Sequence, residues 1–201
     1  MAREGLPFIL IPLAAAAGAA LAGWGPVAAA LAVLGLLCAG FFRDPDRRAP
    51  EDPAAILAPA DGRVTAVERA PEGLRISIFL SVFDVHVNRA PVSGRVESVR
   101  YTRGRFHNAM NEVSAAENER NDVRVATDRG PVEVTQIAGL IARRIVCRVK
   151  AGDRLATGDR FGLIRFGSRT DLRLPPGAEP AVVPGARVAG GETIVARWSA
   201  A

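Results

Sequence analysis

The chain has few of the residues from which metal sites, disulfides and most cofactor sites are built. It contains two cysteines, Cys38 and Cys147, and two histidines, His86 and His107, among 201 residues. The cysteines lie far apart in the sequence and Cys38 belongs to a long apolar run, which excludes a disulfide framework and the usual spacing of metal ligands. We therefore expect a protein of a reducing compartment, with a core that needs no disulfide or metal to be stable.

Lysine and aromatic residues are also scarce. Lys150 is the single lysine, so the net charge of +5 comes from arginine, and aromatic residues make up 5% of the chain. A basic surface favours anionic lipid or nucleic acid as a partner. However, few aromatic side chains are present on which bases could stack, so we expect no nucleic-acid partner. A simple binder of anionic lipid or nucleic acid stays an alternative that rests on charge alone.

Charged residues are missing from residues 5–42. One straight helix of this length would be roughly 57 Å long, whereas the hydrocarbon core of a bilayer is about 30 Å thick. The glycines and the proline at residues 23–26 favour a break, and the tryptophan between them favours the membrane interface. The sequence thus predicts a transmembrane helical hairpin within residues 1–43, with apolar spans at about 6–22 and 26–42.

The flanking charges predict the orientation of this hairpin. Three arginines follow the second apolar segment: Arg43, Arg47 and Arg48. Arg3 precedes the first segment, although Glu4 offsets its charge. By the positive-inside bias, both ends then face the cytoplasm, and the rest of the chain lies on the cytoplasmic side of the cell (inner) membrane. A cleaved signal peptide that ends near residues 19–22 is the alternative, although a second apolar segment follows it immediately.

The chain changes character after a polar, proline-containing linker at residues 44–54. Short runs rich in valine and isoleucine then recur between glycine and proline turns, at residues 75–80, 123–126, 132–137, 145–149, 161–164 and 193–197. Such runs are typical of β-strands, so residues 55–201 are predicted to form a mainly β domain. Residues 108–119 have some helical character, with a long loop as the alternative.

Two pairs of similar segments indicate an internal duplication. APADGRVTAV (58–67) resembles APVSGRVESV (90–99), and GDRLATGDRF (152–161) resembles GARVAGGETI (185–194). Each pair shares a glycine turn and the apolar position that follows it. We therefore predict a duplicated β unit folded into a compact barrel or sandwich, with chance recurrence of short strings as the alternative.

Few residues are candidates for acid-base chemistry. His86 lies between Val85 and Val87, so on a strand it would point to the face opposite the valines, which help to exclude water. This environment suits a proton-transfer residue, with a surface or hydrogen-bonded strand histidine as the alternative. Asp61 precedes a glycine, where ordinary turn chemistry accounts for it. His107 lies in a polar, glycine-flanked segment and is predicted to be structural or at the rim of a site.

The chain resembles the short, prokaryotic phosphatidylserine decarboxylases. The resemblance is carried, in the order of the family, by FFRDPDR (41–47), APADG (58–62), FLSVFDVHVNRAPVSG (79–94), NERN (118–121), IAGLIARRIVC (137–147) and GDRFGLIRFGS (158–168). None of these segments is decisive alone, but the ordered set extends over almost the whole chain. The family is made as a proenzyme that cuts itself at a Gly-Ser bond, and Gly167-Ser168 fits that bond here.

The resemblance implies that Ser168 becomes a pyruvoyl group. A serine hydroxyl can attack the carbonyl before it and turn the amide into an ester, and glycine allows the close approach that this needs. Elimination would free a large chain ending at Gly167, and the resemblance implies a heterodimer of large and small chains. The new ketone can condense with an anionic amino-phospholipid as a Schiff base and accept electrons as carbon dioxide leaves. Decarboxylation of phosphatidylserine to phosphatidylethanolamine is thus implied, with no metal and no pyridoxal phosphate.

The resemblance also suggests roles for three side chains. Asp61 and His86 match family positions used for self-cleavage and proton handling. Longer members carry a second histidine three places after the first, where this chain has Arg89. Whether His86 serves both self-cleavage and decarboxylation is therefore open, and Arg89 is a candidate to hold a substrate carboxylate or phosphate.

The main alternative to an enzyme is a non-catalytic, membrane-tethered carrier or adaptor domain of the barrel-sandwich type. The repeated glycine turns suit such a domain. A biotinyl or lipoyl carrier needs a lysine at a hairpin tip, whereas Lys150 is predicted to lie at a strand end outside such a motif.

Overall fold

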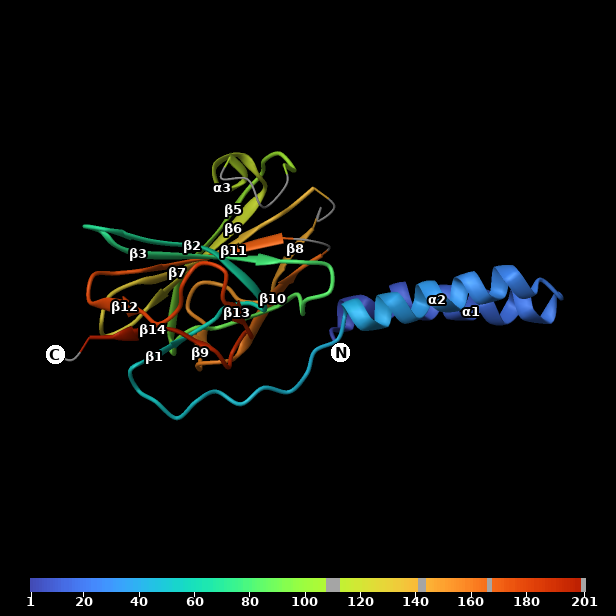
Figure 1. The fold of residues 1–201 in the computed structure, drawn as a ribbon, viewed down its shortest axis with the longest axis horizontal. Helices are drawn as coiled ribbons and strands as arrows, with labels where there is room; N and C mark the ends of the chain where they lie inside the picture. Colours follow the sequence, from blue (N-terminus) through green and yellow to red (C-terminus); the bar gives the residue numbers. More distant parts are fainter. Residues whose placement is uncertain (108–112, 141–143, 166–167, 200–201) are drawn as a thin grey trace. The chain divides into compact units, whose positions relative to one another are not determined.

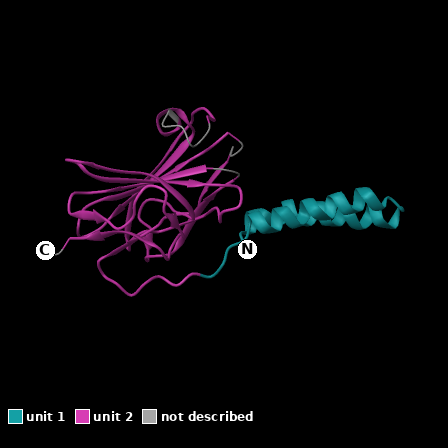
Figure 2. Ribbon diagram, in the orientation of Figure 1, with its two compact units in different colours: residues 1–46 teal, residues 47–201 magenta. Residues whose placement is uncertain are grey.

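The structure is a computed structural model of the chain, and it describes all residues except 108–112, 141–143, 166–167 and 200–201 (Figure 1). The chain divides into two compact units, Met1–Asp46 and Arg47–Ala201 (Figure 2). The narrower boundaries predicted for the hairpin, the linker and the β domain stay predictions.

The first unit is a hairpin of two apolar helices. A short 3-10 helix, η1 (Arg3–Gly5), precedes α1 (Leu6–Leu21), and α2 (Gly25–Phe41) runs back along α1. Gly23 has a φ of 79°, a backbone conformation that glycine adopts readily, and it turns the chain between the helices. The two ends meet where the rings of Phe8 and Phe42 stack with their centroids 5.6 Å apart. The predicted helical hairpin is confirmed.

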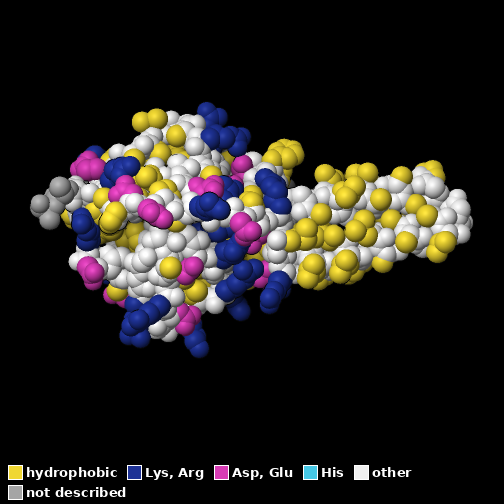
Figure 3. Space-filling view, turned by 90° about the horizontal axis from the view of Figure 1, so that it is seen from below, with side chains coloured by type: hydrophobic (Ala, Val, Ile, Leu, Met, Phe, Trp, Pro, Cys, Tyr) yellow, Lys and Arg dark blue, Asp and Glu magenta, His cyan; other side chains and the backbone are white. Residues whose placement is uncertain are grey.

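The composition of the hairpin is that expected of a membrane anchor. The helical stretch Arg3–Leu21 has 19 residues and a mean hydropathy of 1.7, which is long and apolar enough to cross a membrane. Gly25–Phe41 is a shorter apolar helix. In Figure 3 this unit shows hydrophobic side chains, whereas Lys, Arg, Asp and Glu gather on the other unit.

The second unit is mainly β, as predicted. Its largest sheet is curled and has eight strands in the order β13-β2-β3-β11-β7-β6-β5-β9, and two smaller sheets have the orders β1-β14-β12 and β4-β10-β8 (Figure 1). The strands are β1 (Ala55–Leu57), β2 (Gly62–Ala70), β3 (Gly73–Leu80), β4 (Val87–Arg89), β5 (Gly94–Thr102), β6 (Arg120–Ala126), β7 (Val132–Ile137), β8 (Ile145–Cys147), β9 (Arg154–Leu155), β10 (Arg160–Ile164), β11 (Ser168–Leu174), β12 (Ala178–Pro180), β13 (Arg187–Val188) and β14 (Ile194–Trp198).

The six apolar runs predicted as strands fall in β3, β6, β7, β8, β10 and β14. The described part of the predicted helical stretch contains one short helix, α3 (Val113–Glu117), and residues 108–112 lie outside the described residues. The run at 145–149 is shorter than predicted, because β8 ends at Cys147.

The predicted duplication is visible in the strand pairing. β2 and β5 begin at the glycines of the first repeat pair, and each pairs at its start with a two-residue strand, β13 or β9, from the second repeat pair. In the same way, β1 pairs with β14 and β4 pairs with β10. One copy consists of β4 to β10, inserted into the other copy between β3 and β11. The similar segments therefore reflect a repeated structure rather than chance.

Strand β11 lies in the middle of the large sheet, between β3 and β7. Alternate residues of a strand point to opposite faces. Leu172 and Leu174 are buried in the apolar core, so Ser168 and Thr170 share the core face. A fully buried leucine contributes about 1.5–3 kcal/mol, so this face anchors the strand.

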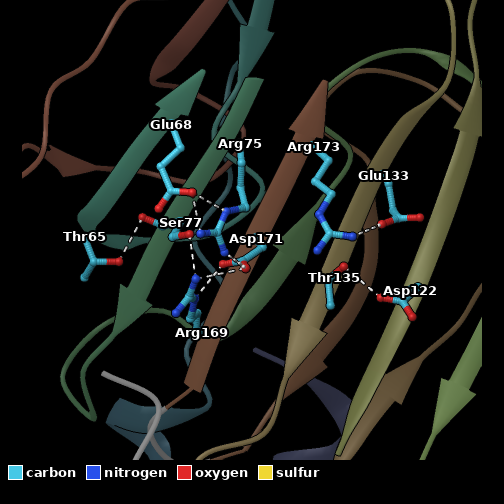
Figure 4. A network of polar contacts seen from close by, with 10 residues as sticks. All are labelled: Thr65, Glu68, Arg75, Ser77, Asp122, Glu133, Thr135, Arg169, Asp171 and Arg173. Atoms are coloured by element: carbon cyan, nitrogen blue, oxygen red, sulfur yellow. Dashed lines mark hydrogen bonds and ion pairs between the residues drawn. The ribbon is translucent and has the colours of Figure 1, made fainter. Parts of the chain in front are cut away.

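The opposite face of β11 carries a polar network (Figure 4). Arg169, which is 4% exposed, donates from Nε to Asp171 Oδ1 at 2.6 Å and from Nη2 to Ser77 Oγ on β3 at 2.9 Å. Breaking a buried ion pair by removing one partner typically costs about 3–5 kcal/mol. The network therefore holds the first residues of β11 firmly against β3.

Candidate active site

Ser168 begins β11 with its side chain fully buried. It pairs with Leu80 of β3 and is 0% exposed. Within the part of the chain that the structure describes, its hydroxyl oxygen has no hydrogen-bond partner. Leaving a buried hydroxyl unpaired costs about 1–3 kcal/mol, so a group of this kind calls for a functional explanation. Gly167, the other half of the predicted cleavage bond, lies outside the described residues.

His86 lies directly before β4 rather than inside a strand, and it is 2% exposed. Its Nδ1 atom is 2.9 Å from the main-chain oxygen of Asp84. A carbonyl oxygen can only accept, so Nδ1 carries the hydrogen, and in the neutral ring the lone pair is on Nε2. This is the form of histidine that can take a proton as a general base.

A side-chain contact between two sheets brings His86 to the end of the fold where Ser168 lies. Asn88 donates from Nδ2 to Thr170 Oγ1 at 3.1 Å, so β4 and β11 touch through these side chains. His86 is two residues before Asn88, and Ser168 is two residues before Thr170, so in an extended chain each shares the face of its neighbour. The amide of Ile164 donates to the His86 carbonyl, and Ile164 is four residues before Ser168. Both side chains therefore lie toward the same end of β4 and β11.

A buried chain of amide groups supports this contact. Gln136 on β7 donates to Asn88 Oδ1 at 2.8 Å, and Asn121 on β6 donates to Gln136 Oε1 at 2.9 Å. All three side chains are at most 2% exposed. A satisfied buried network of this kind is rigid and holds β4, β7 and β11 at fixed spacing. These residues belong to no motif that the sequence shows, and polar side chains inside apolar strand runs were the only available signal.

The main-chain oxygen that holds His86 belongs to a tight turn. Asp84 Oδ2 accepts from the Ser81 amide at 2.8 Å and from its hydroxyl at 2.7 Å, while the Asp84 amide donates to the Ser81 carbonyl. Arg187 of β13 donates to the other carboxylate oxygen at 3.0 Å. Nothing in the sequence alone assigns a role to Asp84. Four hydrogen bonds fix this residue, and through it the ring of His86.

Asp61 is held between a main-chain amide and an arginine. Its carboxylate accepts from the Gly190 amide at 2.8 Å and from Arg47 Nη2 at 2.8 Å. Burial raises the pKa of Asp61 above its ordinary value, although the Gly190 amide and Arg47 oppose this, and the nearby charge of Asp84 raises the pKa further. The carboxylate of Asp61 thus binds a proton more readily than an ordinary aspartate does.

Comparison of the two copies shows which contact of Asp61 belongs to the repeat and which is its own. Ser93 occupies the matching position in the other copy, and its hydroxyl accepts from the Thr157 amide at 2.9 Å, just as Asp61 accepts from Gly190. This acceptor contact is therefore a structural feature of the repeat. A negative charge paired with Arg47 is what Asp61 has in addition.

Arg89 lies on the other side of β4 from His86. It is 4% exposed, its Nη1 donates to the Gly158 carbonyl at 3.3 Å, and its side chain packs so closely on Gly191 that an added Cβ would come within 2.7 Å of Arg89 Cδ. These contacts favour a structural role. The predicted contact of Arg89 with a substrate carboxylate or phosphate stays a prediction.

Two other expectations concern His107 and metal ions. His107 lies beside α3, with Nε2 3.1 Å from Glu117 Oε2. Among the described residues, no group of three or more His, Cys, Asp or Glu side chains is arranged to hold a metal ion.

Comparison with known proteins relates this site to a family. The family model described as phosphatidylserine decarboxylase matches residues 34–196, a range that includes Asp61, His86 and Ser168. Three similar proteins are named phosphatidylserine decarboxylase proenzyme. That of Nocardia farcinica is 48% identical, over 97% of this chain and 86% of the relative. That of Mycobacterium ulcerans is 50% identical, over 96% and 84%, and that of Solibacter usitatus is 50% identical, over 94% of each. The chain therefore belongs to the phosphatidylserine decarboxylase family.

Proposed function

We propose that this decarboxylase converts phosphatidylserine to phosphatidylethanolamine, after its own chain is cut between Gly167 and Ser168. The single observation that carries the proposal is the buried hydroxyl of Ser168, which has no partner among the described residues. Family membership supports the reaction type, and the word proenzyme in the names of the relatives supports processing. Because the chain belongs to an enzyme family, we do not retain the alternative of a non-catalytic carrier or adaptor domain.

The self-cleavage begins with attack of the Ser168 hydroxyl oxygen on the carbonyl carbon of residue 167. His86 Nε2 accepts the hydroxyl proton and passes it to the Ser168 nitrogen as the C–N bond breaks, so that an ester bond to Ser168 replaces the amide bond. Loss of the α-proton of Ser168 then breaks the ester, and the upstream chain leaves with a carboxylate at Gly167. The remaining unsaturated residue takes up water and releases ammonia, which leaves a ketone at the new amino terminus.

The surroundings of Ser168 fit a pyruvoyl group, because the position is buried on the core face of β11 and has an unpaired polar atom. When bound there, a pyruvoyl group supplies an electron sink for decarboxylation. Thr170 and the Asn88 amide hold the strand beside it. The proton that His86 carries is then available to replace the carbon dioxide that leaves the substrate.

The fold explains how the two chains would stay together as a heterodimer after cleavage. β11 keeps its ladders with β3 and β7, and β14 keeps its ladders with β1 and β12. The buried contacts of Arg169 also join the small chain to Ser77 of the large chain. Cutting the chain before Ser168 removes none of these interactions.

The proposed cleavage is tested by mass spectrometry of the purified, full-length protein. We expect a large chain of residues 1–167 and a small chain of residues 168–201. The small chain should lack a free amino terminus and be lighter by one ammonia than the same peptide beginning with serine. A single intact chain in an actively decarboxylating preparation would contradict the proposal.

Asp61→Asn is expected to slow self-cleavage by roughly 10-fold or more, so that proenzyme accumulates. The amide keeps an oxygen acceptor for the Gly190 amide but loses the charge that pairs with Arg47 and the basicity that burial confers. The measurement is a time course of proenzyme disappearance on denaturing gels. Ser93→Ala is the matched control, since it removes the equivalent turn contact of the other copy and should leave cleavage close to normal.

The raised pKa of Asp61 also predicts a pH effect on stability. Because the folded state binds this proton more tightly, the associated stability is present below the ordinary carboxyl pKa and is lost as pH rises through the folded value. Asp61→Asn should flatten this part of the stability curve in denaturant unfolding. An unchanged curve and unchanged cleavage together would remove Asp61 from the mechanism.

We place the enzyme at the inner membrane, with its β domain on the cytoplasmic side. The apolar helical hairpin supports membrane attachment, and the arginines that flank it support the orientation. An anionic amino-phospholipid in that membrane is then the substrate.

A further inference from the structure

The segments that leave the large sheet at one end form a defined surface. Leu80 pairs with Ser168, and Ile137 pairs with both Arg169 and Arg120, so β3, β7 and β6 have an end beside the first residues of β11. Thr102, the last residue of β5, pairs with Arg120. We call this the Ser168 end, made of the described residues 81–86, 101–107, 138–140 and 144. In Figure 1 it lies on the side away from the tip of the β2–β3 hairpin.

Exposed apolar side chains of the β unit concentrate at the Ser168 end. Among its described residues, five large hydrophobic side chains are exposed: Val82 at 43%, Phe83 at 81%, Tyr101 at 52%, Leu140 at 63% and Val183 at 68%. All but Val183 belong to the Ser168 end. The described connections at the opposite end, residues 71–72, 127–131 and 175–177, contribute none of them. The exposed large apolar side chains thus distinguish the Ser168 end from the opposite end of the sheet.

Val82 and Phe83 lie in a turn whose backbone is held rigid by hydrogen bonds. Both ends of the turn are tied by the hydrogen bonds between Ser81 and Asp84, and Arg187 holds the Asp84 carboxylate from outside. The same Asp84 accepts the His86 Nδ1 hydrogen on its main-chain oxygen. The exposed apolar tip and the histidine are thus parts of one rigid segment.

Arginines accompany these apolar side chains. Arg103, Arg105 and Arg144 are exposed at the Ser168 end, where Arg105 also forms an ion pair with Glu117. Arg187, whose side chain is 76% exposed, forms an ion pair with Asp84. Apolar tips among basic side chains are the composition of surfaces that bind anionic membranes, where the apolar groups enter the headgroup region and the arginines meet lipid phosphates.

We propose that the Ser168 end docks on an anionic phospholipid bilayer, with Val82 and Phe83 inserted among the headgroups. The inference deepens the proposed function and rests on it for the identity of the substrate. The serine headgroup of a phospholipid lies at the bilayer surface, and Ser168 is buried at this end of the fold. Docking here would bring the headgroup to the segment that carries His86, without extracting the lipid fully from the membrane.

The docking is tested on the full chain, reconstituted in vesicles of phosphatidylcholine and phosphatidylglycerol. Phe83→Trp is made in a Trp24→Phe background, and the vesicles include brominated phosphatidylcholine, which quenches nearby indole fluorescence. Glu72→Trp, in the β2–β3 turn at the opposite end of the sheet, is the matched control. Trp198 contributes equally to both proteins.

We expect bromine-dependent quenching with Phe83→Trp and little with Glu72→Trp. Equal quenching of the two would overturn the proposal. The proposal would also be overturned if quenching of the Phe83→Trp fluorescence became weaker as more protein was added per vesicle. That result would mean that a second copy of the chain covers this surface. The quenching measurement does not depend on enzyme activity. Quenching without decarboxylation would support docking through the Ser168 end and refute the proposed function. Decarboxylation without quenching would support the proposed function and refute the docking.

A kinetic comparison tests the consequence for the substrate. The double variant Val82→Ser, Phe83→Ser should lower kcat/KM on phosphatidylserine in vesicles by roughly 10-fold, because insertion loses its apolar contribution. Its kcat/KM on a short-chain, monomeric phosphatidylserine should match that of the unaltered enzyme, as should its self-cleavage. Equal losses on both substrates, or no loss on either, would refute docking through this turn.

Discussion

Ser168→Ala is expected to accumulate as one intact chain and to release no carbon dioxide. Alanine has no nucleophile to attack the carbonyl before it, so neither the new amino terminus nor its ketone can form. The variant should nevertheless fold at least as stably as the unaltered proenzyme, because it removes a buried hydroxyl with no partner among the described residues. Such an unpaired group costs about 1–3 kcal/mol. Denaturing electrophoresis with intact mass measures the first result, an assay of released carbon dioxide the second, and thermal unfolding the third.

Two further variants sharpen this experiment. Ser93→Ala removes a serine hydroxyl from a turn of the other copy and should mature normally. Ser168→Cys restores a nucleophile, and its cleavage should be accelerated by hydroxylamine, which attacks the thioester that replaces the ester. Two chains from Ser168→Ala would mean that another residue supplies the nucleophile.

His86→Ala should lower the rate of decarboxylation by about 100-fold to 10,000-fold, the usual effect of removing a general acid or base. The expectation follows from the tautomer of the ring, because Nδ1 donates to the Asp84 carbonyl and Nε2 carries the lone pair of the neutral imidazole. Release of carbon dioxide from enzyme that has already matured measures this step without interference from cleavage.

The same variant shows whether one histidine serves two reactions. If His86 also activates Ser168, its proenzyme should disappear more slowly, and both defects should appear in one protein. His107→Ala is the matched control, since His107 is the other histidine of the chain and contacts Glu117 beside α3. Normal rates for both reactions in His86→Ala would remove His86 from the mechanism and leave Asp61 as the leading base.

The sequence offered candidates for the site because these residues belong to local patterns. Ser168 follows a glycine at the end of a motif, and His86 stands between two valines, so both became candidates once these segments were seen to resemble the family. The buried polar side chains that hold the strands around these two residues could not be predicted in this way. Asn88, Gln136 and Thr170 lie on three strands that are far apart in sequence, and the hydrogen bonds between them depend on how two sheets pack against each other.

Asp61 and Arg89 show how the fold changes what a motif implies. Both stand in segments that resemble the family, but the folded chain gives Asp61 a turn amide and an arginine as partners and directs Arg89 toward Gly158. The comparison of Asp61 with Ser93 was possible only after the two copies could be aligned by their strand pairs. A repeated contact indicates structure, and what differs between the copies indicates function.

The sequence alone predicted the helical hairpin and the mainly β character of the rest, and it indicated two similar copies, which the strand pairing then established. These follow from local properties: an uncharged run, β-branched residues between turns, and repeated glycine turns. The tertiary structure alone decided that one copy is inserted between β3 and β11, that β11 is a central strand, and that Ser168 is buried while Phe83 is exposed. Burial and pairing depend on which distant segments pack together, and the free energy of that packing belongs to the whole fold rather than to any single stretch of residues.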